Sequence, residues 1–251
     1  AELRPGEVCG VPACRRGPCG PSRGGTVDVG EPVLRGCAGA EPSPVGAGVI
    51  PNVVHAYWGG GPIPNWQADL LDVWREKHEV MFWTDDHLPD LRTRDLFDDP
   101  ARFSPLTHPG QFRSDLLRWE VLHDYGGVWV DCDLEWRRDI SPLLELPGFA
   151  AWELQDRFIN TAFLGFPAGH PALVTIVEGL REQVLSNPGL RIPTAGVYAT
   201  PILRGRDDVV VLEKRQVYPY LYGEWERANG PFDDDVWVVH HWANARRNAG
   251  M

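Results

Sequence analysis

Two acidic residues, Asp131 and Asp133, follow an apolar run in the stretch YGGVWVDCDLE. In a β-strand, side chains alternate between two faces, so these carboxylates would point the same way, roughly 6.6–7 Å apart along the chain. Two carboxylates held close together repel unless a cation or a hydrogen-bond donor lies between them. Oxygen ligands suit Mg²⁺ or Mn²⁺, which offset the charge of a departing phosphate. The pattern indicates a divalent-metal site, although a bare Asp-x-Asp is also typical of a solvated strand end.

Upstream of these acids, the segment SDLLRWEVLHDYGG predicts a helix over residues 113–125 that ends at Gly126. Asp115 and Arg118 are three residues apart and therefore share a helical face. A carboxylate accepts hydrogen bonds from sugar hydroxyls, and a guanidinium complements phosphate charge. The alternative interpretation is a surface ion pair of little energy.

Strands alternate with helices along the rest of the chain, which indicates an α/β fold with a mainly parallel sheet flanked by helices. The expected strands are 53–58, 79–86, 127–133, 158–166, 208–212 and 236–240, and the expected helices are 64–78, 113–125 and 170–186. On the strand expected at 127–133, the side chains of Val128, Val130 and Cys132, and of Leu134 after it, should point away from the acids and into the core.

Residues 1–48 are rich in Gly, Pro and Cys and show no helical or strand periodicity. We expect an irregular N-terminal extension there and a single domain over residues 49–251. Four of the five cysteines, Cys9, Cys14, Cys19 and Cys37, lie in this extension. Their spacing is compatible with a metal or disulfide site, or with reduced thiols in a loose tail.

The overall charge is −11, from 24 Lys and Arg against 35 Asp and Glu, so the surface should repel nucleic acid. No apolar run is long enough to span a bilayer, and the sequence begins with no signal-peptide pattern. These features predict a cytoplasmic protein with no membrane span.

The block SDLLRWEVLHDYGGVWVDCD resembles the signature of glycosyltransferase family 32, whose members carry a sugar-binding region with a DXD motif. The large glucosylating bacterial toxins have a similar pattern. The likeness begins with IPNVVHAYWGGGPIPNW, continues in INTAFLGFPAGHP and ends in VVHHW. It leaves out the N-terminal extension.

This resemblance implies a GT-A-type, Rossmann-like fold and the transfer of a hexose from a nucleotide-sugar to an acceptor hydroxyl. It further implies retention at the anomeric carbon and a Mn²⁺ or Mg²⁺ cofactor. The donor could be UDP- or GDP-linked, and the acceptor could be a glycan, a lipid, a peptide or a small metabolite. The same-face route, in which the leaving diphosphate guides the acceptor, is favoured because no second acid within the motifs is placed as a nucleophile.

By resemblance, Asp133 ligates the metal, and Asp131 reaches the ribose or the sugar and also serves the metal. Asp115 and Arg118 match the helix residues that hold the donor sugar and its phosphate, with Arg118 stabilising the diphosphate as it leaves.

Aromatic and amide residues complete the implied donor site. Trp58 matches the aromatic that stacks on the nucleobase, although a core Trp is the alternative. Asn160 matches an Asn near the transferred sugar, or else is a turn residue, and Trp242 matches a family aromatic.

One of the two histidines in VHHWANAR is expected to complete the metal shell as a neutral imidazole. Alternation along a strand allows at most one of them to serve, and His241 is chosen over His240. Ala245 and Arg246 stand where the family has Ser and Trp, which puts in doubt the lid contact of that Trp. Arg246 could supply a charge there instead.

Two other functions remain open. The first is a sugar- or metal-binding module that has lost catalysis. The second is a phosphotransferase of the haloacid-dehalogenase kind, but that family places Thr or Val where Glu135 stands here.

Overall fold

The computed structural model describes residues 48–100, 108–188, 194–243 and residue 245. All of the elements below belong to one compact unit within Cys37–Met251. The expectations for the N-terminal extension, its cysteines and Arg246 lie outside the described residues.

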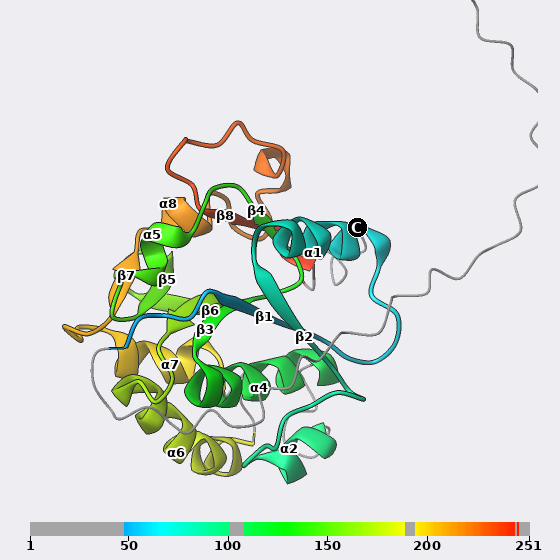
Figure 1. Ribbon diagram of the computed structural model, residues 1–251, viewed down its shortest axis with the longest axis vertical. Helices are drawn as coiled ribbons and strands as arrows, with labels where there is room; N and C mark the ends of the chain where they lie inside the picture. The colour runs from blue at the N-terminus through cyan, green and yellow to red at the C-terminus, as the bar shows by residue number, and fades with distance from the viewer. Residues whose placement is uncertain (1–47, 101–107, 189–193, 244, 246–251) are drawn as a thin grey trace, which may run out of the picture. The chain divides into compact units, whose positions relative to one another are not determined.

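A six-stranded sheet forms the centre of the fold, and the expected α/β arrangement of a mainly parallel sheet flanked by helices is confirmed (Figure 1). Across the sheet the strands are β2 (Glu79–Thr84), β1 (Val53–Trp58), β3 (Gly127–Val130), β6 (Phe158–Phe166), β5 (Phe149–Leu154) and β7 (Val210–Leu212). The pairs β2–β1, β1–β3 and β5–β7 are parallel, whereas β6 runs antiparallel to both of its neighbours.

A separate ribbon joins the chain after the acids to the C-terminal segment. Strand β4 (Leu134–Trp136) pairs antiparallel with β8 (Val238–His240), with Leu134 opposite His240. The expected last strand therefore exists, but it belongs to this ribbon and not to the central sheet. The pairing brings the C-terminal histidines next to the acidic motif.

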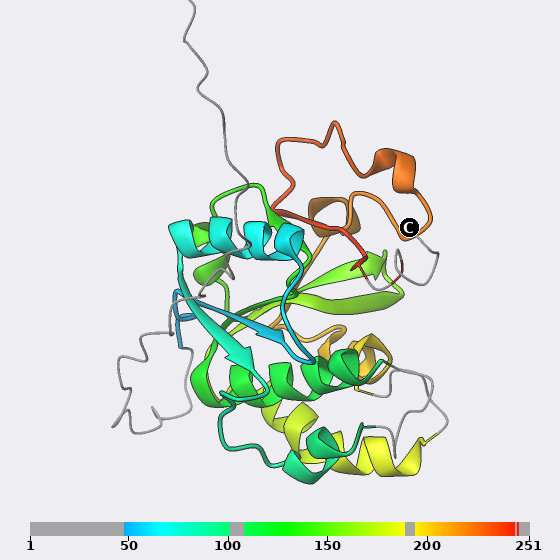
Figure 2. The same cartoon turned by 90° about the vertical axis from the view of Figure 1, so that its right-hand side faces the viewer.

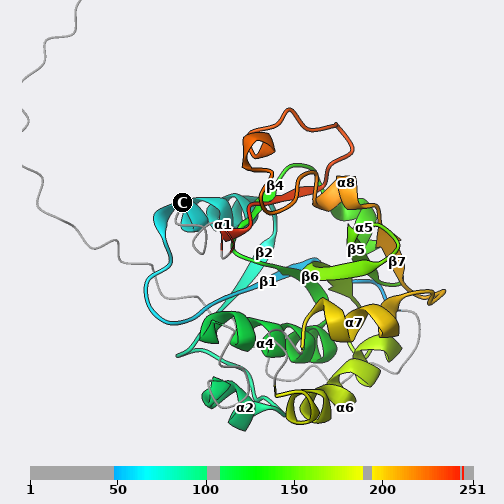
Figure 3. The same cartoon turned by 180° about the vertical axis from the view of Figure 1, so that it is seen from behind.

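Helices cover both faces of the sheet (Figures 2 and 3). One face carries α2 (Arg94–Asp98), α4 (Pro109–Tyr125), α6 (Pro171–Ser186) and α7 (Gly196–Leu203). The other carries α1 (Asn65–Lys77), α5 (Ser141–Leu144), α8 (Lys214–Val217) and the β4–β8 ribbon, with the short 3₁₀ helix Trp225–Arg227 beyond it. Each face has its own hydrophobic cluster.

Strand β3 lies in the middle of the sheet, and its side chains alternate between these two clusters. Val128 and Val130 join the cluster on the α1 face, and Trp129 joins the one on the α4 face. Cys132 and Leu134 continue the first set, as predicted. A strand buried on both faces is typical of a parallel sheet enclosed by helices.

Two glycines connect α4 to β3. Gly126 and Gly127 have φ of 67° and 96°, a region that side chains with a Cβ rarely adopt. A Cβ on Gly127 would lie 2.5 Å from the carbonyl oxygen of Val53, and one on Gly126 would lie 2.6 Å from the amide nitrogen of Ala168. This tight junction fixes where β3 begins.

In the part of the chain that the structure describes, no helix combines the length and apolar character that a bilayer crossing requires.

His55 gives the fold a specific sensitivity to acid. Its ring is buried, with Nε2 2.9 Å from the Gly126 carbonyl oxygen, while Trp83 Nε1 donates to Nδ1 at 3.3 Å. Burial lowers the pKa of His55 to about 4, against 6.5 when exposed. Because the unfolded chain takes up this proton first, the stability contributed by neutral His55 is complete above pH 6.5 and is lost as the pH falls through 4.

We expect His55 to account for a loss of about 3 kcal/mol in unfolding free energy between pH 7 and pH 4. Urea denaturation of wild type and His55→Gln at both pH values measures this, because the variant lacks the titrating group. Equal pH dependence in the two proteins would contradict the assignment.

Candidate active site

The two aspartates of the sequence motif come together through a turn and not through strand pleating. Strand β3 ends at Val130, and the amide of Leu134 donates to the carbonyl oxygen of Asp131 at 2.9 Å. The expectation that residues 127–133 form one continuous strand is therefore wrong at its last three positions. The tight turn allows the two carboxylates to converge more closely than positions i and i+2 of an extended strand.

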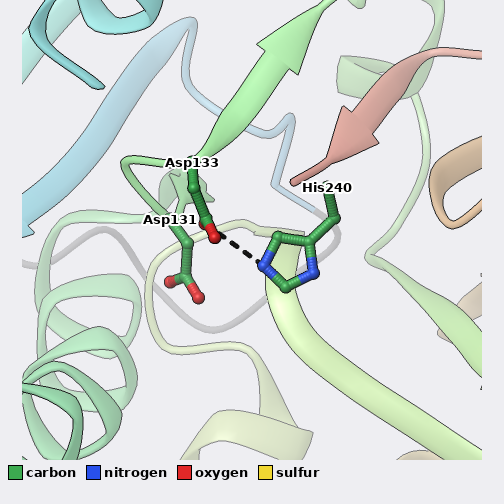
Figure 4. A group of neighbouring side chains, drawn as sticks. All are labelled: Asp131, Asp133 and His240. Atoms are coloured by element: carbon green, nitrogen blue, oxygen red, sulfur yellow. Dashed lines mark ion pairs between the residues drawn. The ribbon is translucent and has the colours of Figure 1, made fainter. Parts of the chain in front are cut away.

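Asp131, Asp133 and His240 form a cluster in which one potential ligand atom from each lies within 4.8 Å of the others (Figure 4). His240 Nε2 is 3.2 Å from Asp133 Oδ1. Two carboxylates and an imidazole at this separation could hold a divalent cation.

The histidine in this cluster is His240, and not the predicted His241. His241 points elsewhere, with Nε2 2.9 Å from Glu135 Oε2 and Nδ1 3.1 Å from the Tyr220 hydroxyl. The two side chains point in different directions, as predicted, but it is His240 and not His241 that faces the acids. The reason is the β4–β8 pairing, which sets His240 opposite Leu134, directly after Asp133.

The C-terminal segment is fastened to Asp133 at several points. The amide of Ala243 donates to Asp133 Oδ2 at 2.7 Å, and the amide of His241 donates to the Asp133 carbonyl oxygen at 3.0 Å. Trp242 has a φ of 54°, and its ring centroid is 4.3 Å from that of His240. A left-handed backbone at a bulky residue costs on the order of 1–3 kcal/mol and clusters at functional sites.

Arg118 links the helix α4 to the motif. Its Nη2 is 2.9 Å from Asp115 Oδ1 and 3.1 Å from Asp131 Oδ1, and Nη1 donates to the Thr161 hydroxyl. Both charged residues of the helical pair are buried, so the interpretation as a surface ion pair is wrong. Asp131 Oδ1 also accepts from Trp129 Nε1 at 2.9 Å, and these contacts fix its carboxylate.

Burial and neighbouring charges shift the pKa values of the ionisable groups at this site. Burial raises the pKa of Asp115 to about 7, with Arg118 acting in the opposite direction. Burial also raises the pKa of Asp131. Burial opposes the charge of the Asp133–His240 pair as well, but their mutual attraction prevails, lowering the pKa of Asp133 and raising that of His240. A proton and a metal ion would therefore compete for the same imidazole nitrogen of His240.

These residues line a cleft with a volume of about 1310 Å³. Such a volume exceeds the usual range for drug-sized ligands, about 300–1,000 Å³, and leaves room for a nucleotide carrying a further group. Of the sequence-predicted site residues, the cleft brings together Trp58, Asp115, Arg118, Asp131, Asp133, Asn160 and Trp242, and it leaves out His241.

Two features of the cleft lay outside the sequence prediction. Glu153 of β5 lines it, and Asn160 Nδ2 donates to Glu153 Oε2 at 2.6 Å. The aromatic side chains of Trp66 and Tyr222, 43% and 61% exposed, also line it. The acid at the end of the apolar run FAAWEL was the available signal for Glu153.

Comparison with known proteins gives a consistent class. The chain is 27% identical over 135 residues to inositol phosphoceramide mannosyltransferase 3 of Schizosaccharomyces pombe, covering 52% of this chain and 37% of the relative. It is 23% identical over 138 residues to mannosyl phosphorylinositol ceramide synthase CSH1 of Saccharomyces cerevisiae, covering 53% and 36%. An uncharacterized glycosyltransferase, L373 of Acanthamoeba polyphaga mimivirus, is 22% identical over 210 residues, 76% of this chain and 82% of that one. These relatives are glycosyltransferases.

The chain spans well under half the length of the yeast relatives it matches. No family model matches it. Among solved structures it is similar to PaToxG glycosyltransferase, with a TM-score of 0.47 and 13% identity over 61% of this chain and 68% of that one. It is also similar to the galactosyltransferase LgtC, with a TM-score of 0.45 and 12% identity over 76% and 87%.

Proposed function

We propose that this protein is a metal-dependent glycosyltransferase that moves a hexose from a nucleotide-sugar to an acceptor hydroxyl with retention, and that it is a relative of family 32 and the glucosylating toxins. The observation that carries the proposal is the meeting of Asp131, Asp133 and His240 in the large cleft that the α4 pair also lines. The sequence relatives, which are glycosyltransferases, support the same class.

The donor set of the cluster fits a divalent ion. Carboxylates suit Mg²⁺ and Mn²⁺, while the imidazole favours Mn²⁺ of the two. Asp131, Asp133 and His240 would hold it, and the ion would offset negative charge on the leaving nucleoside diphosphate. His240 must be neutral to act as a ligand, so it gives up its proton when the ion binds.

The remaining residues of the cleft bind and orient the donor. Trp58, half-buried at the end of β1, offers a ring face to the nucleobase, worth roughly 1–3 kcal/mol. Asp115, whose Oδ2 has no hydrogen-bond partner among the described residues, is available to a sugar hydroxyl. Arg118 holds Asp115 and Asp131 in position and keeps a positive charge beside the diphosphate.

The names of the relatives supply candidates for the transferred sugar and for the acceptor. We take mannose as the first candidate sugar, since the yeast relatives are mannosyltransferases, and an inositol-bearing acceptor as the first candidate acceptor. The exposed rings of Trp66 and Tyr222 would present flat apolar faces to the C–H face of such a cyclic polyol.

Incubating the protein with Mn²⁺ and GDP-mannose, UDP-glucose or UDP-N-acetylglucosamine tests the proposal. We expect one donor to release its nucleoside diphosphate faster than in the EDTA control, with hydrolysis or transfer of the sugar. Binding without turnover would indicate a non-catalytic module. Cleavage of p-nitrophenyl phosphate with no attack on any nucleotide-sugar would indicate a phosphotransferase.

A further inference from the structure

Glu153 is an acid in the cleft that the proposed mechanism leaves without a role. It lies near the end of β5, next to β6, where Ala151 pairs with Asn160. It lines the same cleft as Asp131, Asp133 and His240. Asn160, which donates to Glu153, lies two residues before Ala162, and the Ala162 carbonyl oxygen accepts from the amide of Asp131 at 3.0 Å, so Glu153 lies beside the metal cluster.

The neighbouring Asn160 is already engaged by the protein. Its Oδ1 accepts from the amide of Ala162 at 2.8 Å, and its Nδ2 donates to Glu153 Oε2 at 2.6 Å. An Asn side chain has a single carbonyl oxygen. One of its two lone pairs is taken by the Ala162 amide, and the charged, stronger acceptor that lines the cleft beside it is the Glu153 carboxylate, which Asn160 orients.

No cation pairs with Glu153 among the described residues, since none of their ion pairs includes it. Asn160 supplies its one hydrogen bond there, to Oε2, so Oε1 is left to the cleft. Burial raises the pKa of Glu153, with Asn160 opposing it. Removing a carboxylate from water is costly unless hydrogen-bond donors replace the water. This geometry therefore suits a ligand that brings hydroxyl groups.

Glu153 is also distinct from the metal cluster. The group of side chains able to share one ion contains Asp131, Asp133 and His240, and Glu153 is not a member of it. Next to the metal-binding end, the part of a nucleotide-sugar that carries hydroxyls and no negative charge is the sugar itself. Two carboxylate oxygens can accept from neighbouring hydroxyls of one ring.

We propose that Glu153, oriented by Asn160, binds the hydroxyl groups of the transferred sugar and so selects the sugar of the donor. This inference rests on the proposed function, because it assumes that a nucleotide-sugar occupies the cleft. Glu153 acts in sugar recognition, and Asn160 is a positioning residue.

The test compares Glu153→Gln with wild type by isothermal titration in Mn²⁺, using GDP and UDP alone and then GDP-mannose, UDP-glucose and UDP-N-acetylglucosamine. We expect the affinity of the variant for the bound nucleotide-sugar to fall about 10- to 100-fold, since hydrogen bonds to charged groups are of that size. Its affinity for the free nucleoside diphosphate should stay within twofold of wild type. Glu178→Gln, an exposed substitution on α6 away from the cleft, is the matched control and should change neither affinity.

Several results would overturn the inference. Equal losses for nucleotide and nucleotide-sugar would mean that Glu153 acts on the nucleotide or on the fold. Unchanged affinity with abolished turnover would make it a nucleophile or a base. If Glu153→Gln fails to fold, Asn160→Ser should show the same selective loss to a smaller degree. The absence of a selective loss in Asn160→Ser would contradict the inference. If wild type binds neither nucleotides nor nucleotide-sugars, the proposed function fails together with this inference.

Discussion

Replacing Asp133 by asparagine should abolish metal-dependent sugar transfer while leaving the fold intact. Asparagine has nearly the same size and keeps a carbonyl oxygen for the amide of Ala243, which now donates to Asp133 Oδ2 at 2.7 Å. What disappears is the negative charge beside His240 Nε2, 3.2 Å away, and with it one ligand of the cluster. Because the stabilisation supplied by a catalytic ion amounts to several kcal/mol, we expect a loss of about a thousandfold or more.

Three measurements on Asp133→Asn separate loss of the site from loss of the fold. Thermal unfolding should stay close to wild type, Mn²⁺ binding by titration calorimetry should weaken strongly, and nucleoside diphosphate release should reach the EDTA background. The control is Glu135→Gln, which removes a charge two residues away that pairs with His241 outside the cluster. Transfer by Asp133→Asn at the wild-type rate would show that the ion is held elsewhere.

Local sequence patterns predicted helix α4 but not its first residues, and they missed strand β5. The helix expected at 113–125 is α4, which starts earlier, at Pro109. Proline at the first turn is a known start signal, but the cap here is His108, whose Nδ1 accepts from the amide of Gly110, and His is not a usual cap. Strand β5 was missed because a short apolar run such as FAAWEL does not distinguish a buried strand from a buried helix.

The choice between His240 and His241 shows what local patterns lack. Alternation along a strand predicts that only one can face the acids, and this much is confirmed by their separate partners. Which one does so depends on the register between β4 and β8, segments about a hundred residues apart in the chain. Val238 and Val239 of β8 and Leu134 of β4 are all buried in the core, so the register of this pairing depends on packing in the assembled fold.

Asp131 and Asp133 come together as the Asp-x-Asp pattern predicts, but through a turn and not along a strand. Strand alternation and a turn both allow Asp131 and Asp133 to share a site, so the two conformations cannot be separated from the motif alone. The packing of Cys132 with Val128 and Val130 preserves the alternating burial through the turn. Sequence periodicity therefore reported the burial of these residues and not their backbone conformation.

Arg118→Lys should fold but transfer sugar about a hundredfold more slowly than wild type. Lysine keeps a positive charge near Asp115, so the buried carboxylates still have a cation beside them. Arg118→Ala would remove that cation, and we expect this loss to cost about 3–5 kcal/mol of stability. A single ammonium cannot reproduce the fork by which Arg118 contacts Asp115, Asp131 and the Thr161 hydroxyl together. Asp131 then loses its fixed orientation, and Mn²⁺ affinity should fall along with turnover.

The control for this substitution is Arg113→Lys on the same helix. Arg113 donates to the Phe97 carbonyl oxygen at 2.9 Å and pairs with Asp85, and its side chain does not line the cleft. Arg118 likewise donates from Nε to a backbone oxygen, that of Ser114, at 3.3 Å, so both variants should lose some stability in thermal unfolding. Only Arg118→Lys should also weaken Mn²⁺ binding and sugar transfer. If it matches Arg113→Lys in both, the guanidinium of Arg118 stabilises the fold and has no part in positioning the Asp131 carboxylate for a metal ion.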